Sequence, residues 1–134
     1  MRIILRPEGL RGPFVRDIES ISEQHLLDCN QCGRCSAGCP LVDEMDYLPN
    51  QVIRLAQLGI EDVLDSRTPW VCAACLMCQA RCPKGVDIPR IMEALRQVAL
   101  RKGNPLLSVT QLDPTLLAHA PQMAIVGALR KAGK

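Results

Sequence analysis

The chain has 134 residues and a formal net charge of +2, and 48% of its residues are hydrophobic although only 2% are aromatic. This length suits one domain with terminal extensions and a modest core, and is short for a catalytic fold with its own substrate pocket. The basic residues are scattered, with no aromatic residues among them to stack on bases, so the composition argues against nucleic-acid binding.

The first predicted elements precede residue 29. Residues 2–6 are the one stretch with a weak alternating pattern and form the only candidate strand. Apolar residues spaced as on one helix face predict a helix over residues 14–22, followed by a loop through Asp28. We therefore expect residues 1–13 to be an N-terminal extension and the domain to begin at residue 14.

Two cysteine runs with the same spacing dominate the sequence. Both read CxxCxxCxxxCP, the ligand pattern of proteins that hold two [4Fe-4S] clusters. CxxCxxC brings three thiolates to one cluster, and in two-cluster ferredoxins the cysteine before the proline binds the other cluster. We therefore expect one cluster on Cys29, Cys32, Cys35 and Cys82, and the other on Cys72, Cys75, Cys78 and Cys39.

Zinc and disulfides are the alternative uses of these cysteines. A structural zinc ion needs only two CxxC pairs, so a third cysteine in each run and the CP ending exceed its requirement. Cysteines two residues apart on a tight turn are poorly placed to pair with each other, and nothing indicates a secreted protein. Both alternatives are less favoured than the clusters.

The segments between and after the motifs are predicted to be helical. Residues 49–58 have one apolar side opposite Gln51, Arg54 and Gln57, and Gly59 then closes this helix. A shorter helix is expected over 61–66. Asp87 is a suitable N-cap for a helix that runs to Gly103.

Residues 108–134 are expected to form a C-terminal helical tail. One short helix is predicted to begin at Asp113 and Pro114 and another over 122–131, with Pro121 between them. The tail either docks a partner or covers the core of its own domain. Since no other segment alternates like a strand, we predict an all-α protein in which short helices surround two clusters and each motif leads into a helix.

Charged and glycine residues near the motifs are secondary candidates. Arg34, Arg81 and Lys84 could stabilise the more negative reduced cluster, or could be ordinary solvated charges or partner contacts. Gly33 and Gly38 could allow the backbone to approach a cluster closely, or could form plain turns.

The strings LLDCNQCGRCSAGCP and WVCAACLMCQARCPKGVDIPRIMEALR resemble the C subunit of heterodisulfide reductase, a two-cluster protein of the α-helical ferredoxin type. The resemblance covers residues 14–107. It implies an electron-transfer subunit that is not an enzyme by itself and passes electrons between a flavin-containing iron–sulfur subunit and a catalytic cysteine-rich subunit.

Two other functional classes remain open. The chain could be the iron–sulfur subunit of another oxidoreductase, of the succinate dehydrogenase, fumarate reductase, glycolate oxidase or quinone-interacting type, or a free-standing ferredoxin carrier. The apolar run at residues 3–5 is too short for a signal-peptide core, and the run at 123–129 is too short to span a bilayer. We therefore expect a cytoplasmic protein without a membrane span.

Overall fold

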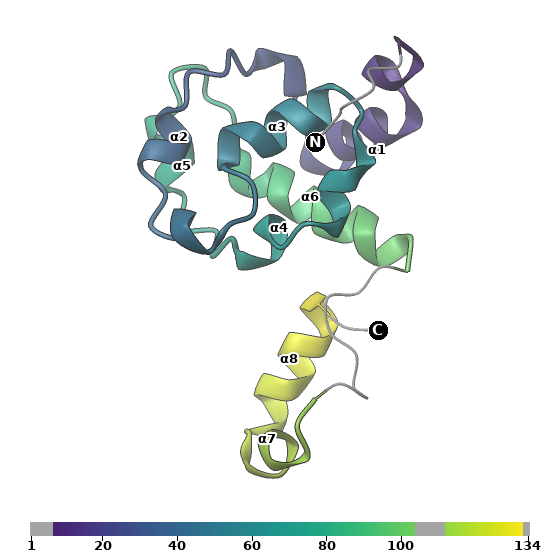
Figure 1. Ribbon diagram of the computed structural model, residues 1–134, viewed down its shortest axis with the longest axis vertical. Coiled ribbons are helices and arrows are strands. Elements are labelled where there is room, and N and C mark those ends of the chain that lie inside the picture. Colours follow the sequence, from purple (N-terminus) through teal and green to yellow (C-terminus); the bar gives the residue numbers. More distant parts are fainter. Residues whose placement is uncertain (1–6, 104–111, 133–134) are drawn as a thin grey trace.

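Figure 1 shows the fold in a computed structural model, which describes residues 7–103 and 112–132. The regular structure of these residues is helical throughout, so the prediction of an all-α protein is confirmed. The candidate strand over residues 2–6 and the predicted boundary between residues 107 and 108 lie outside the described residues. The elements, with 3-10 helices written as η, are η1 (Pro7–Arg11), α1 (Pro13–Ser22), η2 (Leu26–Asp28), α2 (Arg34–Ala37), η3 (Val42–Glu44), α3 (Pro49–Gln57), η4 (Glu61–Asp65), α4 (Thr68–Val71), α5 (Met77–Arg81), α6 (Ile88–Arg101), α7 (Pro114–His119) and α8 (Gln122–Ala132).

The three longer predicted helices of the domain correspond to α1, α3 and α6, and the two predicted tail helices correspond to α7 and α8. The short helix expected over 61–66 is the 3-10 helix η4. The first motif leads into the short 3-10 helix η3 and then into α3, which begins at Pro49. Gly59 ends α3 with a φ of 69°, and a Cβ at this position would lie 2.1 Å from the Gly9 carbonyl oxygen, so only glycine fits there.

Helix α6 lies at the centre of the core. Helices α1, α3, α4 and α5 and the 3-10 helix η4 all contact it. Ile91 and Leu95 of α6 are fully buried, and each such side chain contributes roughly 1.5–3 kcal/mol through burial. Helix α6 begins six residues after the last cysteine of the second motif, so the packing of α6 in the core fixes the position of the end of that motif.

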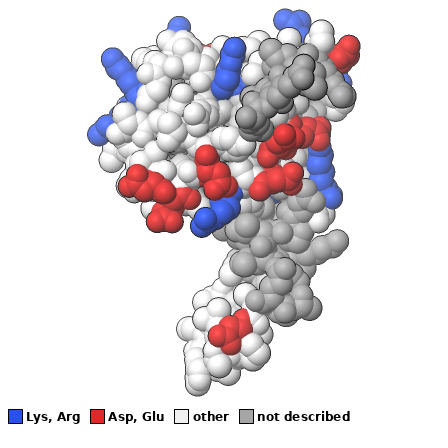
Figure 2. All heavy atoms as spheres, in the orientation of Figure 1, with Lys and Arg blue, Asp and Glu red and all other residues white. Residues whose placement is uncertain are grey.

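Acidic side chains are concentrated in the chain between the two motifs. In Figure 2 most of the acidic side chains on this face lie across the lower part of the domain, and basic side chains lie along the top and the left rim and also beside the acids. The exposed acids of this part of the chain are Asp43, Glu44, Asp46, Glu61, Asp62 and Asp65.

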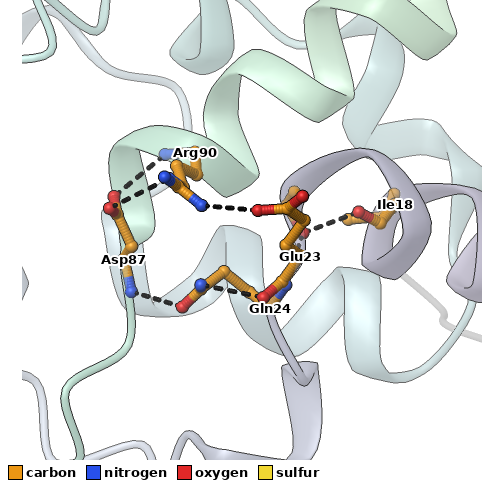
Figure 3. A network of polar contacts seen from close by, with 6 residues as sticks. Ile18, Glu23, Gln24, Asp87 and Arg90 are labelled. Carbon is orange, nitrogen blue, oxygen red and sulfur yellow. Dashed lines mark hydrogen bonds and ion pairs between the residues drawn. The ribbon is translucent and has the colours of Figure 1, made fainter.

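Polar contacts join the end of α1 to the start of α6 (Figure 3). The Gln24 side-chain oxygen accepts a hydrogen bond of 2.9 Å from the Asp87 amide. The Asp87 carboxylate in turn caps α6 by accepting from the Arg90 amide at 3.2 Å, as its predicted N-cap role requires. An ion pair of 3.0 Å between Arg90 and Glu23 adds little, since both side chains are exposed. The network fixes the segment that connects the second motif to α6.

Candidate iron–sulfur site

The two motifs share one backbone conformation. In the first motif, Gln31 and Gly33 have left-handed φ values of 60° and 76°. The matching residues of the second motif, Ala74 and Leu76, have φ values of 52° and 64°. Left-handed residues in tight turns are typical of backbone concavities that bind anionic groups, iron–sulfur centres among them. Three of these four residues are not glycine, so the conformation is costly and indicates a functional site.

Each motif turns from its third to its fourth cysteine through a short helix, α2 in the first and α5 in the second. Helices α2 and α5 contact each other and lie side by side in Figure 1. Gly38 lies against the Arg81 side chain at this contact, since a Cβ there would lie 2.6 Å from the Arg81 guanidinium. The close approach that glycine permits is therefore to the Arg81 side chain.

The contact between α2 and α5 brings cysteines of both motifs together. Three cysteines of the first motif and the last cysteine of the second line one hollow, together with apolar side chains of α3 and α6 and the polar residues Asn30 and Asn50. We call this hollow, with Cys29, Cys32, Cys35 and Cys82, the first site.

A second hollow has the reciprocal composition. Three cysteines of the second motif and the last cysteine of the first line it, and its other residues are apolar, with Met77, Ile88 and Met92 among them. We call this hollow, with Cys72, Cys75, Cys78 and Cys39, the second site. The structure thus groups the eight cysteines into the two sets expected from the sequence. Four thiols around each of two hollows are a donor set that fits a [4Fe-4S] cluster.

The cysteines differ in exposure. The middle cysteine of each CxxCxxC run, Cys32 or Cys75, is exposed, whereas Cys35 is buried. Burial raises the pKa of the Cys35 thiol, and it raises the pKa of Cys78 to about 11. Both thiols would stay protonated at neutral pH, so metal binding must displace their protons. The exposed middle cysteines bring one edge of each site to the surface.

Hydrogen bonds reach the sulfur atoms of the first site. The Gln31 side chain donates to Cys29 Sγ and the Val86 amide donates to Cys82 Sγ, each at 3.4 Å. Donors to thiolate sulfurs stabilise added negative charge and so influence the potential of an iron–sulfur centre. Arg34 also lines this site, so one of the three candidate cations lies where a cluster would be. The effects of Arg34, Arg81 and Lys84 on the reduction potential of a cluster stay predictions.

Two buried polar residues next to the sites were missed in the sequence. Gln57 was expected on the polar side of its helix, which is wrong: it is 4% exposed and donates to the Cys29 carbonyl oxygen at 3.1 Å. Arg96 is 3% exposed and donates to the Cys72 carbonyl oxygen at 3.4 Å. One signal was available, since Gln57 follows Ile53 by four residues and shares its buried face.

The all-α fold and the two four-cysteine sites define an α-helical ferredoxin with two clusters. Residues 25–86 match the family described as "4Fe-4S dicluster domain", which confirms the prediction of two [4Fe-4S] clusters. Which cysteines bind which cluster stays a prediction.

Curated proteins similar to this chain are named as C subunits of heterodisulfide reductases. The chain is 42% identical over 80 residues, 60% of its length, to an iron–sulfur C subunit of CoB–CoM heterodisulfide reductase from Methanocaldococcus jannaschii, of which it covers 43%. It is 32% identical over 109 residues, 75% of its length, to the corresponding C subunit from Methanopyrus kandleri, of which it covers 57%. The chain contains a 4Fe-4S dicluster domain and is related to the C-subunit family of heterodisulfide reductases, as its motifs predicted. It spans about half the length of these curated relatives.

Proposed function

We propose that the chain relays electrons, one at a time, through two [4Fe-4S] clusters as a subunit of a heterodisulfide-reductase-like complex. The observation that carries the proposal is the reciprocal composition of the two sites, each lined by three cysteines of one motif and the last of the other. When bound, the clusters supply two one-electron centres. We assign Cys29, Cys32, Cys35 and Cys82 to one, and Cys72, Cys75, Cys78 and Cys39 to the other.

The chain's own residues position the sites and give electrons access to them. The left-handed turns shape each backbone concavity, and the packing of α2 against α5 keeps the two sites adjacent. Exposed Cys32 and Cys75 place one edge of each site at the surface, so one site can receive an electron from a partner while the other passes it on. Proximity of two one-electron centres suits a relay.

A relay needs partners on both sides. We propose a flavin-containing iron–sulfur subunit and a catalytic cysteine-rich subunit, since the related proteins are named as C subunits of heterodisulfide reductases. The tail supports a subunit role, because α7 and α8 stand apart from the domain in Figure 1 and carry exposed Leu116 and Met123. No helix among the described residues is long and apolar enough to cross a membrane.

The test is purification without oxygen, followed by metal analysis and assays of the chain alone. About eight iron and about eight acid-labile sulfide per chain are expected, with reduction by a strong reductant. Disulfide reduction should appear only when partner subunits are added. Steady turnover by the isolated chain, or bound zinc without sulfide, would contradict the proposal, and subunits that co-purify from the native source would identify the complex.

A further inference from the structure

The first cysteine of each motif is held in the same way by a buried side chain from a distant helix. Gln57 Nε2, on α3, donates to the carbonyl oxygens of Leu26 and Cys29 at 2.7 and 3.1 Å. Arg96 Nη1, on α6, donates to the carbonyl oxygens of Pro69 and Cys72 at 2.6 and 3.4 Å. In both cases the acceptors are the first cysteine and the residue three positions before it.

The two donors perform the same task with different charge. Gln57 shows that a neutral amide is sufficient to bind both carbonyls. A buried guanidinium carries a larger desolvation cost, which is offset only when it is paired. Arg96 pairs with Glu93 through Nε at 2.8 Å and through Nη2, and the Glu93 side chain is 49% exposed whereas that of Arg96 is 3% exposed. The positive charge thus lies inside the protein, and its counter-charge lies at the surface.

This arrangement matters for the second site, because Cys72 is one of its four cysteines. A [4Fe-4S] cluster held by these cysteines would accept one electron from a one-electron donor such as a reduced cluster of a partner, and its core charge would fall from 2+ to 1+ without uptake of a proton. A buried cation beside a ligand stabilises the added charge, and water screens the Glu93 carboxylate more strongly.

We infer that Gln57 and Arg96 are equivalent positioning residues for Cys29 and Cys72, and that the charge of Arg96 raises the reduction potential of the second site. The inference rests on the proposed function, since it requires that both sites hold clusters. Arg81 is not a cation of one site alone, because its side chain lies against Gly38, which precedes Cys39 of the second site, whereas Arg81 itself precedes Cys82 of the first site.

The experiment is an anaerobic redox titration of the full chain, followed by electron paramagnetic resonance. Arg96→Gln gives the second site a neutral glutamine in place of the arginine, as Gln57 already is at the first site. We expect iron to stay at about eight per chain, and the reduced fraction of the second site at a fixed potential to fall about tenfold, which corresponds to about 59 mV for one electron. The first site should not change.

Glu93→Gln should shift the potential of the second site in the opposite direction. It tests the effect of the Arg96 charge even if Arg96→Gln does not fold. It removes the surface counter-charge and keeps the guanidinium, so the potential of the second site should rise. Glu61→Gln is the matched control: Glu61 is also an exposed acid in an ion pair, with Lys102 at 2.6 Å, and its loss should move neither potential. Gln57→Leu tests positioning and should lower the iron content with selective loss of the first-site signal.

The double variant Cys29→Ala with Cys32→Ala shows which spectroscopic signal belongs to which site. It removes two ligands of the first site whether or not ligation crosses between the motifs. Full iron content with unchanged potentials in Arg96→Gln and Glu93→Gln would overturn the inference about charge. Full iron content and an unchanged spectrum in Gln57→Leu would overturn the positioning role. Failure of the proposed function is distinguishable, because the unsubstituted chain would then lack eight iron or fail to accept electrons.

Discussion

Gln31 and Ala74 occupy the same position in the two motifs, and exchanging these side chains tests how a single hydrogen bond tunes one site. Both residues lie two positions after the first cysteine, with left-handed φ values of 60° and 52°. Because both positions have a left-handed backbone, each substitution changes the side chain while the strain in the backbone stays similar. Gln31 donates to Cys29 Sγ at 3.4 Å, whereas an alanine side chain has no polar atom to donate.

The expected magnitude follows from the charge on the acceptor. A hydrogen bond to a charged group contributes about 1.5–3 kcal/mol, and it strengthens when the site gains an electron. If about 1 kcal/mol of it depends on the added electron, the potential shifts by roughly 40 mV. We expect Gln31→Ala to lower the potential of the first site by this amount, and Ala74→Gln to raise that of the second site.

The assay is the same anaerobic titration, with iron content measured on each sample. Asn30→Ala is the control, because Asn30 lines the first site and, among the described residues, makes no hydrogen bond to a sulfur. It should shift the potential less than Gln31→Ala does. An unchanged first-site potential in Gln31→Ala, with iron intact, would refute the reasoning, as would an equal shift of both sites.

Three further predictions concern stability. Gly59→Ala should lower the free energy of unfolding by at least about 1–3 kcal/mol, because the added Cβ would lie 2.1 Å from the Gly9 carbonyl oxygen; an unchanged denaturation midpoint would contradict this close approach. Asp87→Ala should lower the free energy of unfolding by about 1 kcal/mol through loss of the α6 N-cap, as measured by thermal unfolding. Asp17→Ala, which removes an exposed acid, is the control. Removal of the clusters by oxidation and chelation should lower the helical circular dichroism, and a metal-free chain with full helicity would show that the fold does not depend on them.

The sequence predicted the parts of the fold and site that depend on local pattern. Helix α6 has an N-cap at Asp87 and apolar residues at helical spacing, and both features are visible without tertiary information. The grouping of cysteines followed from the spacing of known cluster motifs. The roles of Gln57 and Arg96 were not predictable in this way, because their acceptors at Cys29 and Cys72 lie 28 and 24 residues away. A buried polar side chain depends on which groups the fold brings opposite it.

The left-handed backbone of the second motif was also not predictable from residue type. Gly33 is the kind of residue that favours a positive φ, whereas Leu76 adopts one at the matching position. The similarity of the two motifs in spacing was evident, and the structure extends it to the backbone. The approach of Arg81 to Gly38 likewise depends on the contact between α2 and α5 and becomes visible only in three dimensions.

The central claim is that two clusters are each held by cysteines of both motifs, and paired double variants test it most directly. Cys29→Ala with Cys82→Ala removes two ligands from the first site, whereas Cys29→Ala with Cys39→Ala removes one ligand from each site. Iron content and the spectrum of the reduced protein are measured for both. The account predicts that the first variant keeps one intact cluster of about four iron and that the second variant is damaged at both sites. One untouched cluster in the Cys29 and Cys39 variant, with damage at both sites in the Cys29 and Cys82 variant, would contradict it.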